Sequence, residues 1–256
     1  MLPLTLAIIT RNEEARLARA IQSVGPVAEL LVLDSGSTDK TVELAQALGA
    51  RVLCCDWPGY GAQKNRALAE AQQEWVLSLD ADEALSDSLR KSLEALFEEG
   101  PAGEAYAVLR QNHWKGKRLR HGCYGPSWKT RLVRKGCGSW VGGILHEELV
   151  AKGPVKRLSG VLDHWPYADE AEFLATSEAY AALFASKSFE EGRRAHWWDV
   201  AFRPSLHFVK SVLLKGGFME GKEGWTLARL GAREVGLKWR SLRVLQAGEP
   251  LRTLGE

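Results

Sequence analysis

The sequence has few cysteines, no long apolar run and almost no net charge. The four cysteines, Cys54, Cys55, Cys123 and Cys137, match no zinc-ligand spacing, and a chain of 256 residues needs no disulfide scaffold. We therefore expect reduced thiols and a cytoplasmic protein. No apolar run approaches the roughly 20 residues that span a bilayer. The apolar N-terminal segment has no basic region before it, which favours a first strand over a signal peptide.

Two glycine-rich signatures are also absent. The chain contains neither the G-x-G-x-x-G fingerprint of dinucleotide-binding folds nor the G-x-x-x-x-G-K phosphate loop. A hydrophobic content of 45% excludes an intrinsically disordered chain. The composition is that of a globular protein with a sizeable core.

The net charge of +2 combines segments of opposite sign. Residues 1–104 hold 9 basic and 17 acidic residues, whereas residues 105–165 hold 12 basic and 3 acidic residues. This distribution predicts a site where carboxylates hold a metal ion and nearby cations meet an anionic ligand. The alternative is chance segregation of charges on solvated faces.

The first hundred residues alternate short apolar runs with segments of helical periodicity. The expected strands are residues 4–9, 30–33, 51–55 and 75–79, and the expected helices are residues 15–24, 42–48, 61–73 and 85–97. Strands that alternate with helices form a mostly parallel sheet with helices on both faces, so the expected fold class is α/β. Asn12 is a candidate cap for the first helix.

The regular alternation ends after residue 100. Strands expected at residues 106–109, 130–133 and 144–150 indicate a partly antiparallel region, and helices are expected from residue 169, at 204–219 and at 225–239. We therefore expect an α/β domain over residues 1–165, with halves at 1–104 and 105–165. A C-terminal helical segment would cover residues 166–256.

Polar clusters follow four of the expected strands. They are residues 10–13, residues 34–39, Asp56 and residues 80–82. Because ligands of such sheets bind beyond the carboxyl ends of the strands, these clusters predict a site. Asp80 and Asp82, two residues apart at a strand end, can offer oxygens to Mg²⁺ or Mn²⁺. Alternatively, Asp82 caps the helix that follows.

Four of these segments together resemble a known family. IITRNEE at residues 8–14, LVLDSGSTD at 31–39, GAQKN at 61–65 and WVLSLDADE at 75–83 look like the family 2 glycosyltransferases with the GT-A fold. They are most similar to the bacterial branch that adds glucose or a related sugar to the lipopolysaccharide core. A weaker likeness continues through residues 143–147, residues 163–164 and residues 218–225.

The resemblance implies roles for particular residues. The nucleotide would be bound by Thr10, Asn12, Glu13, Asp34, Lys64, Asp80 and Ala81, with Asp80 at the ribose. Asp82 would hold a divalent metal, Mn²⁺ or Mg²⁺, that bridges the diphosphate, and His164 would be a further ligand. Residues 1–104 would form the nucleotide-sugar half and residues 105–165 the acceptor half. Ser35 and Arg11 depart from the family pattern and leave base selectivity open.

Glycosyl transfer also needs a general base to remove the proton of the acceptor hydroxyl. Glu147 resembles the base of the family. Because alternate residues of a strand point to opposite faces, only one of Glu147 and Glu148 can face the site, and we expect it to be Glu147. The alternative is that both glutamates lie on an exposed edge.

The basic middle segment combines cations with Trp114, Tyr124, Trp128 and Trp140. Such a mixture suits phosphorylated sugars, and no nucleic-acid-binding module is recognisable, so we expect a glycan or glycolipid acceptor and no nucleic acid. His113, His121, His196 and His207 are expected to be structural.

Residues 206–213 combine an apolar arc with a basic one. Leu206, Phe208, Val209, Val212 and Leu213 fall on one side of a helix. Such a helix can lie on an anionic membrane, or it can pack on the catalytic domain. We expect peripheral contact at the inner face of the cytoplasmic membrane.

The predicted function is inverting, metal-dependent transfer of a sugar from a nucleotide-diphosphate sugar, UDP-glucose by the resemblance. Two alternatives stay open. A sugar-phosphate nucleotidyltransferase also uses metal-bound carboxylates, but this chain lacks the glycine-rich basic loop after its first strand. A glycosyltransferase-like module without activity could bind at a membrane surface.

Overall fold

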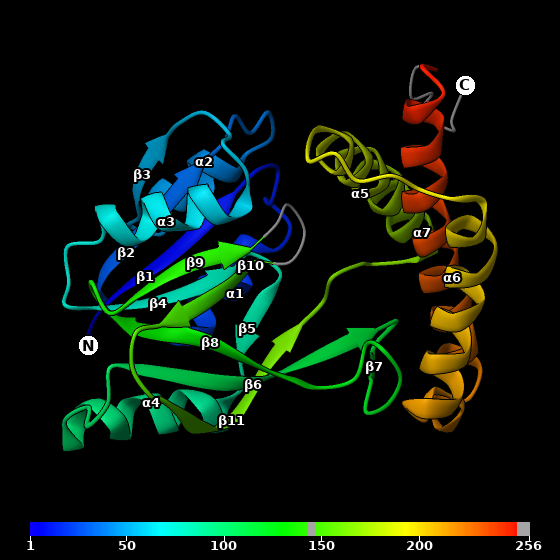
Figure 1. Cartoon of the computed structure of the whole chain (residues 1–256). Coiled ribbons are helices and arrows are strands. Elements are labelled where there is room, and N and C mark those ends of the chain that lie inside the picture. Colours follow the sequence, from blue (N-terminus) through cyan, green and yellow to red (C-terminus); the bar gives the residue numbers. More distant parts are fainter. Residues whose placement is uncertain (143–146, 250–256) are drawn as a thin grey trace. The chain divides into compact units, whose positions relative to one another are not determined.

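The computed structural model describes residues 1–142 and 147–249 and divides the chain into two compact units (Figure 1). The first unit contains residues 1–111 and 127–164, and the second contains residues 112–126 and the chain from Trp165 onward. Strand β6, Ala105–Trp114, begins in the first unit, and its residues from Asn112 belong to the second.

The first unit is built on a mixed sheet. Its strands and helices are β1 (Leu2–Thr10), α1 (Leu17–Val24), β2 (Val27–Asp34), α2 (Thr41–Ala47), β3 (Arg51–Cys54), α3 (Tyr60–Glu70), β4 (Trp75–Asp80), β5 (Glu83–Leu85), α4 (Asp87–Glu99), β8 (Ser127–Arg134), β9 (Gly138–Gly142), β10 (Glu147–Ala151) and β11 (Val155–His164). The strand order of this sheet is β3-β2-β1-β4-β8-β6-β11-β5, and β9 and β10 form a separate antiparallel pair. Pairs β1–β2, β2–β3 and β1–β4 are parallel, whereas β4–β8, β8–β6 and β11–β5 are antiparallel. The expected α/β class is confirmed.

Alternating apolar residues build a core on each face of this sheet. In β1, Leu4, Leu6 and Ile8 join one core with residues of α1, α2 and α4, while Ala7 joins the other with residues of α3. Figure 1 shows α3 and α4 on opposite sides of the sheet. The parallel strands read as continuous apolar runs because both of their faces are buried.

Gly160 in β11 lies against α4 more closely than a side chain allows. Its φ is +100°, and a Cβ there would lie 2.3 Å from the Leu89 nitrogen and 2.5 Å from the Leu89 Cα. We expect Gly160→Ala to lower the free energy of unfolding by roughly 3 kcal/mol, because positive φ and overpacking both cost energy. Chemical denaturation measures this loss.

Gly136→Ala is the matched control. Gly136 has a similar φ of +83°, but no described atom lies within 4 Å of a Cβ built there. Only the backbone cost remains, so we expect a loss of roughly 1 kcal/mol. Equal losses in the two variants would contradict the packing explanation.

The second unit is helical. It contains β7 (Lys117–Arg118), α5 (Glu170–Glu190), α6 (Trp197–Val209), the π-helical turn η1 (Lys210–Leu214), the 3₁₀ turn η2 (Gly217–Glu220) and α7 (Lys222–Gln246). The helix expected at residues 204–219 is wrong at both ends, because α6 begins at Trp197 and ends at Val209. Asp199 accepts a hydrogen bond from the His196 nitrogen and starts α6 early, so Pro204 lies inside the helix. No helix in the described part of the chain is long and apolar enough to cross a membrane.

Candidate active site

The loops after β1 and β2 are joined by side-chain hydrogen bonds. Thr10 Oγ1 donates to Asp34 Oδ1 at 3.0 Å, and Asp34 Oδ2 accepts from the backbone nitrogens of Gly36 and Ser37. The Ser37 hydroxyl also donates to Asp34. Asp34 is buried, and its carboxylate accepts four hydrogen bonds from neighbouring residues. It would have to give up one of these bonds to accept one from the base of a nucleotide.

Asn12 connects the same two loops. Its side-chain Oδ1 accepts from the backbone nitrogen of Thr38 at 2.8 Å, and its backbone nitrogen donates to Ser37 Oγ. The expectation that Asn12 caps α1 is wrong, because Arg16 occupies the position before the helix. Asn12 has a φ of 58°, a conformation that asparagine tolerates better than most residues. The nitrogen of Glu13 donates to Thr41 Oγ1 at 2.7 Å.

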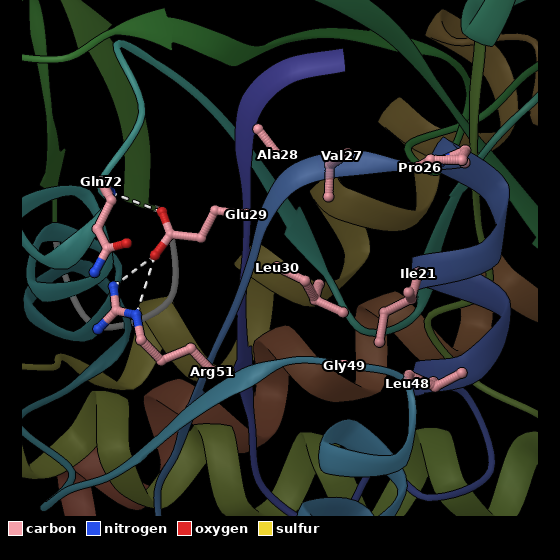
Figure 2. A pocket seen from close by; sticks show the side chains of 11 residues that line it. Ile21, Pro26, Val27, Ala28, Glu29, Leu30, Leu48, Gly49, Arg51 and Gln72 are labelled. Atoms are coloured by element: carbon pink, nitrogen blue, oxygen red, sulfur yellow. Dashed lines mark hydrogen bonds and ion pairs between the residues drawn. The ribbon is translucent and has the colours of Figure 1, made fainter. Parts of the chain in front are cut away.

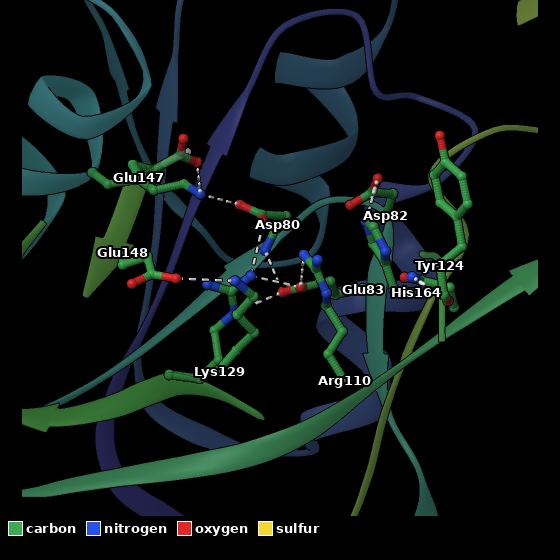
Figure 3. Close-up of polar contacts among 12 residues, drawn as sticks. Asp80, Asp82, Glu83, Arg110, Tyr124, Lys129, Glu147, Glu148 and His164 are labelled. Atoms are coloured by element: carbon green, nitrogen blue, oxygen red, sulfur yellow. Dashed lines mark hydrogen bonds and ion pairs between the residues drawn. The ribbon is translucent and has the colours of Figure 1, made fainter. Parts of the chain in front are cut away.

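Lys64 on α3 brings together the carboxylates of Asp80 and Glu147, both of which are labelled in Figure 3. Its Nζ lies 2.7 Å from Asp80 Oδ1 and 2.8 Å from Glu147 Oε1. The same Nζ lies 4.4 Å from the centre of the Trp140 ring. Burial of Lys64 acts to lower its pKa, but Asp80 and Glu147 together outweigh that effect, so the pKa of Lys64 is raised. Lys64 therefore stays charged and holds Glu147 close to the end of β4.

Arg131 on β8 contacts the other side of Asp80. Its Nη2 lies 2.9 Å from Asp80 Oδ2 and 2.6 Å from Glu83 Oε1, and its Nε donates to Glu83 Oε2 at 3.0 Å. Glu83 and Arg131 are both buried. Burial acts against ionisation of Asp80, but Lys64 and Arg131 outweigh it and hold its pKa well below the usual range. Both oxygens of Asp80 are thus engaged by cations.

Arg110 on β6 reaches the same cluster. Its Nη1 lies 3.7 Å from Glu83 Oε1, and its buried Nε has no hydrogen-bond acceptor among the described residues. Figure 3 shows its guanidinium between Glu83 and Asp82. The cluster therefore offers a third cation beside its carboxylates.

Asp82 and His164 form a separate pair. His164 Nε2, at the end of β11, lies 3.2 Å from Asp82 Oδ2. Burial acts against ionisation of Asp82, but His164 outweighs it, and the pKa of Asp82 is lowered. Asp82 does not cap the following helix, because Ser86 Oγ accepts from the Leu89 nitrogen at the start of α4.

This pair fits a divalent cation in its donor chemistry. A carboxylate oxygen and an imidazole nitrogen suit Mn²⁺. Within residues 1–142 and 147–249, no group of three or more His, Cys, Asp or Glu side chains is arranged to hold a metal. Asp82 and His164 would therefore leave most coordination positions to ligand oxygens and water, as Mg²⁺ and Mn²⁺ sites with phosphate ligands do.

Glu147 and Glu148 point to opposite faces of β10, as alternation predicts. Glu147 contacts Lys64, while the Glu148 side chain is 68% exposed and lies 3.5 Å from Lys129. The side chain of Ala81 packs in the apolar core, so only its backbone could face a ligand. Of the family-like segment at 143–147, residues 143–146 lie outside the described residues.

Comparison with known proteins decides the family. Residues 5–148 match the family described as Glycosyl transferase family 2. The chain belongs to glycosyltransferase family 2. It is 31% identical over 239 residues to the lipopolysaccharide core biosynthesis glycosyltransferase LpsC of Rhizobium meliloti (strain 1021), a match that covers 90% of this chain and 88% of LpsC.

Two further proteins illustrate the range of similarity. This chain is 30% identical over 260 residues to the uncharacterized glycosyltransferase RT0209 of Rickettsia typhi. The match covers 92% of this chain and 88% of RT0209. Glucosyl-3-phosphoglycerate synthase from Mycobacterium tuberculosis, solved with Mn²⁺, UDP and phosphoglyceric acid, is 30% identical over 45% of this chain and 44% of its own, with a TM-score of 0.34.

The motif residues of this glycosyltransferase have partners that sequence reasoning did not assign. Arg131, Arg110 and Glu83 complete the cluster around Asp80, and Trp140 lies against Lys64. The only sequence feature that pointed to these partners was the charge difference between residues 1–104, which are mainly acidic, and residues 105–165, which are mainly basic. These contacts show that some basic residues of the second segment form ion pairs with acidic residues of the first.

Ser35, which departs from the family pattern, is buried and accepts a hydrogen bond from Gln63 Nε2 at 3.0 Å. Arg11 is exposed. The histidines expected to be structural lie in the second unit. His113 stacks on Trp165, His196 stacks on Trp198, and His121 Nδ1 lies 2.9 Å from Glu220 Oε1.

A pocket of about 370 Å³ lies elsewhere in the first unit (Figure 2). It is lined by residues at the beginning of β2, including Val27, Glu29 and Leu30. Glu29 accepts hydrogen bonds there from Arg51 Nη2 at 2.7 Å and from the Gln72 nitrogen at 2.7 Å. Because this pocket lies at the opposite end of β2 from Asp34, it is not part of the candidate active site.

Proposed function

We propose that this glycosyltransferase is an inverting, metal-dependent enzyme that moves a hexose from a nucleotide-diphosphate sugar to a hydroxyl of a cell-envelope glycan or glycolipid. The observation that carries the proposal is the bridge from Lys64 to Asp80 and Glu147. It brings the candidate base to the strand end that carries the candidate nucleotide and metal residues. We assign catalysis to residues 1–165 and treat residues 166–256 as a helical extension.

Glu147 is the proposed general base. Its carboxylate takes the proton of the acceptor hydroxyl as that oxygen forms a bond to the anomeric carbon. The bond from the same carbon to the diphosphate oxygen breaks, and its electron pair leaves with the nucleoside diphosphate. The acceptor attacks from the face opposite the leaving group, so a single displacement inverts the configuration.

Asp82 and His164 are the proposed ligands of a divalent cation, which when bound stabilises negative charge on the departing diphosphate. Arg110 has a guanidinium near both Asp80 and Asp82, and its buried Nε needs an acceptor. A diphosphate oxygen would supply one. Thr10, Asn12, Glu13 and Asp34 are the proposed nucleotide contacts at the ends of β1 and β2.

The relatives support a substrate class for the proposal. LpsC is named for lipopolysaccharide core biosynthesis and matches most of this chain, which supports a core or related envelope glycan as acceptor. We propose UDP-glucose as donor, from the branch of the family that the motifs resemble. We place the reaction in the cytoplasm, at the inner face of the membrane.

A thermal-shift panel of nucleotide-diphosphate sugars, each with and without Mn²⁺, tests donor binding. A ligand at about 100 times its Kd stabilises the folded state by about 2.7 kcal/mol, so we expect UDP-glucose with Mn²⁺ to raise Tm by about 5–10 °C. GDP- and ADP-glucose are the matched controls. A panel in which no nucleotide sugar raises Tm would argue against the proposal.

The products then separate the remaining functions. Glycosyl transfer releases a nucleoside diphosphate and requires an acceptor, whereas a sugar-phosphate nucleotidyltransferase releases pyrophosphate. Membership of a glycosyltransferase family favours the first outcome. Donor binding without any release would indicate a module that binds without catalysis.

A further inference from the structure

Helix α6 carries an exposed apolar stripe in the second unit. The stripe consists of Trp198, Phe202, Leu206, Val209 and, in η1, Leu213. At about 100° per residue, the four members on α6 fall within an arc of about 80°. Leu206 is 65% exposed and Leu213 is 62% exposed. Contiguous exposed apolar side chains of this kind mark interaction surfaces rather than ordinary surface residues.

The stripe is distinct from the face that packs within the unit. The sequence placed Phe208 and Val212 on one arc with Leu206, Val209 and Leu213. In the structure Val212 is buried, and Phe208 is half-buried, with its ring 5.8 Å from that of Trp225. The helix thus packs through other residues and leaves the stripe exposed. The stripe continues at the end of η1 and in η2 with Leu214, Phe218 and Met219.

Helix α7 carries an exposed basic stripe. Its members are Lys222, Arg229, Arg233, Arg240 and Arg243, all of them exposed. With Trp225, they fall within an arc of about 80° of the helix. The glutamates of α7 lie on the other side, where Glu234 pairs with Lys238 and Glu223 pairs with Lys117. Positive charge is therefore concentrated on one face.

The basic stripe borders α6. Trp225 belongs to the same face of α7 as the cations, and its ring contacts Phe208 of α6. The second unit thus combines exposed aromatic and aliphatic side chains with neighbouring exposed cations. This is the combination that binds the interface of an anionic bilayer, where apolar groups enter the headgroup region and cations meet lipid phosphates.

We propose that the second unit docks on an anionic phospholipid bilayer through the apolar stripe of α6–η2 and the basic stripe of α7. Charge complementarity selects this occupant. A second copy docked through the same surface would bring two basic stripes together, and a nucleic acid would leave the apolar stripe without a partner. None of the residues of this surface belongs to the candidate active site, so the docking proposal does not depend on the proposed glycosyl transfer.

Sedimentation with vesicles tests the proposal on the full chain without donor or acceptor. We expect the protein to sediment with vesicles of phosphatidylethanolamine and phosphatidylglycerol, and added salt to weaken this binding. Vesicles of phosphatidylcholine alone should bind far less. Failure to sediment with the anionic vesicles at low salt would overturn the proposal.

Two double variants test the two stripes separately. Arg229→Gln with Arg233→Gln is expected to weaken binding roughly 30-fold, since each cation near an anionic surface contributes about a fivefold factor. Phe202→Ser with Leu213→Ser is expected to weaken it at least about tenfold through lost apolar burial.

Matched controls come from exposed positions of the first unit. Lys91→Gln with Lys152→Gln removes the same charge, and Val150→Ser with Val155→Ser also replaces two exposed apolar side chains with serine. Both should bind vesicles like the wild type. Weakening by the controls equal to that of the stripe variants would overturn the proposal, as would a dimer that the stripe variants dissociate. An unchanged Tm of the stripe variants without any ligand verifies their fold, and it does not depend on the proposed function.

Discussion

Replacing Glu147 with glutamine is expected to lower kcat for glycosyl transfer by a factor of about 10²–10⁴, the usual contribution of a general base. Glutamine keeps the size of the side chain and can still accept a hydrogen bond from Lys64 Nζ, which lies 2.8 Å from Glu147 Oε1. Its amide cannot take a proton from the acceptor hydroxyl. The KM for the donor should change little, because the proposed role concerns the acceptor.

Glu148→Gln is the matched control for this experiment. Glu148 is the next residue of β10, but it points to the opposite face, where its exposed side chain meets Lys129. Initial rates of nucleoside diphosphate release should therefore be close to those of the wild type. Turnover near the wild-type rate in Glu147→Gln would remove Glu147 as the base. Equal losses in both variants would indicate damage to β10 instead.

The α/β fold of the first hundred residues could be predicted because its strands are buried on both faces. Such strands appear as unbroken apolar runs, and the runs at residues 4–9 and 75–79 lie within β1 and β4. Local capping was harder to predict. Asn12 precedes an amphipathic segment, yet its side chain bonds to Thr38, a partner 26 positions away that local pattern cannot reveal.

The helices of the second unit show a similar limit. Proline is common in the first turn of a helix, but α6 passes through Pro204 after starting at Trp197. The exposed stripe of α6 could not be separated from its packing face by periodicity, because both faces are apolar. Only the partners of Phe208 and the burial of Val212 distinguish them.

The gathering of polar residues at one edge of the sheet could be predicted from sequence, but the pairs that they form could not. Parallel strands end at a common edge, so the polar residues after β1, β2 and β4 were expected to gather there. Arg131, by contrast, contacts Glu83 across 48 positions and lies on an antiparallel strand. Nothing near Arg131 in the sequence indicates that it forms an ion pair with a buried carboxylate.

Replacing Asp82 with asparagine is expected to remove most of the metal dependence and to lower activity by a factor of about 10²–10⁴, because Lewis-acid assistance is worth several kcal/mol. Asparagine keeps the shape and can still accept a hydrogen bond from His164 Nε2, which lies 3.2 Å from Asp82 Oδ2. It loses the negative charge that a divalent cation requires. Asp80 is a poor substitute ligand, since Lys64 and Arg131 engage both of its oxygens.

The gain in Tm that Mn²⁺ adds in the presence of UDP measures this loss independently of turnover. It should nearly vanish in Asp82→Asn and persist in Asp87→Asn, a control at an exposed aspartate of α4 whose carboxylate lies 3.3 Å from Arg90. If Asp82→Asn kept the full gain, the cation would have to bind through other residues. The pair formed by Asp82 and His164 would then be an internal contact of the fold and not a metal site.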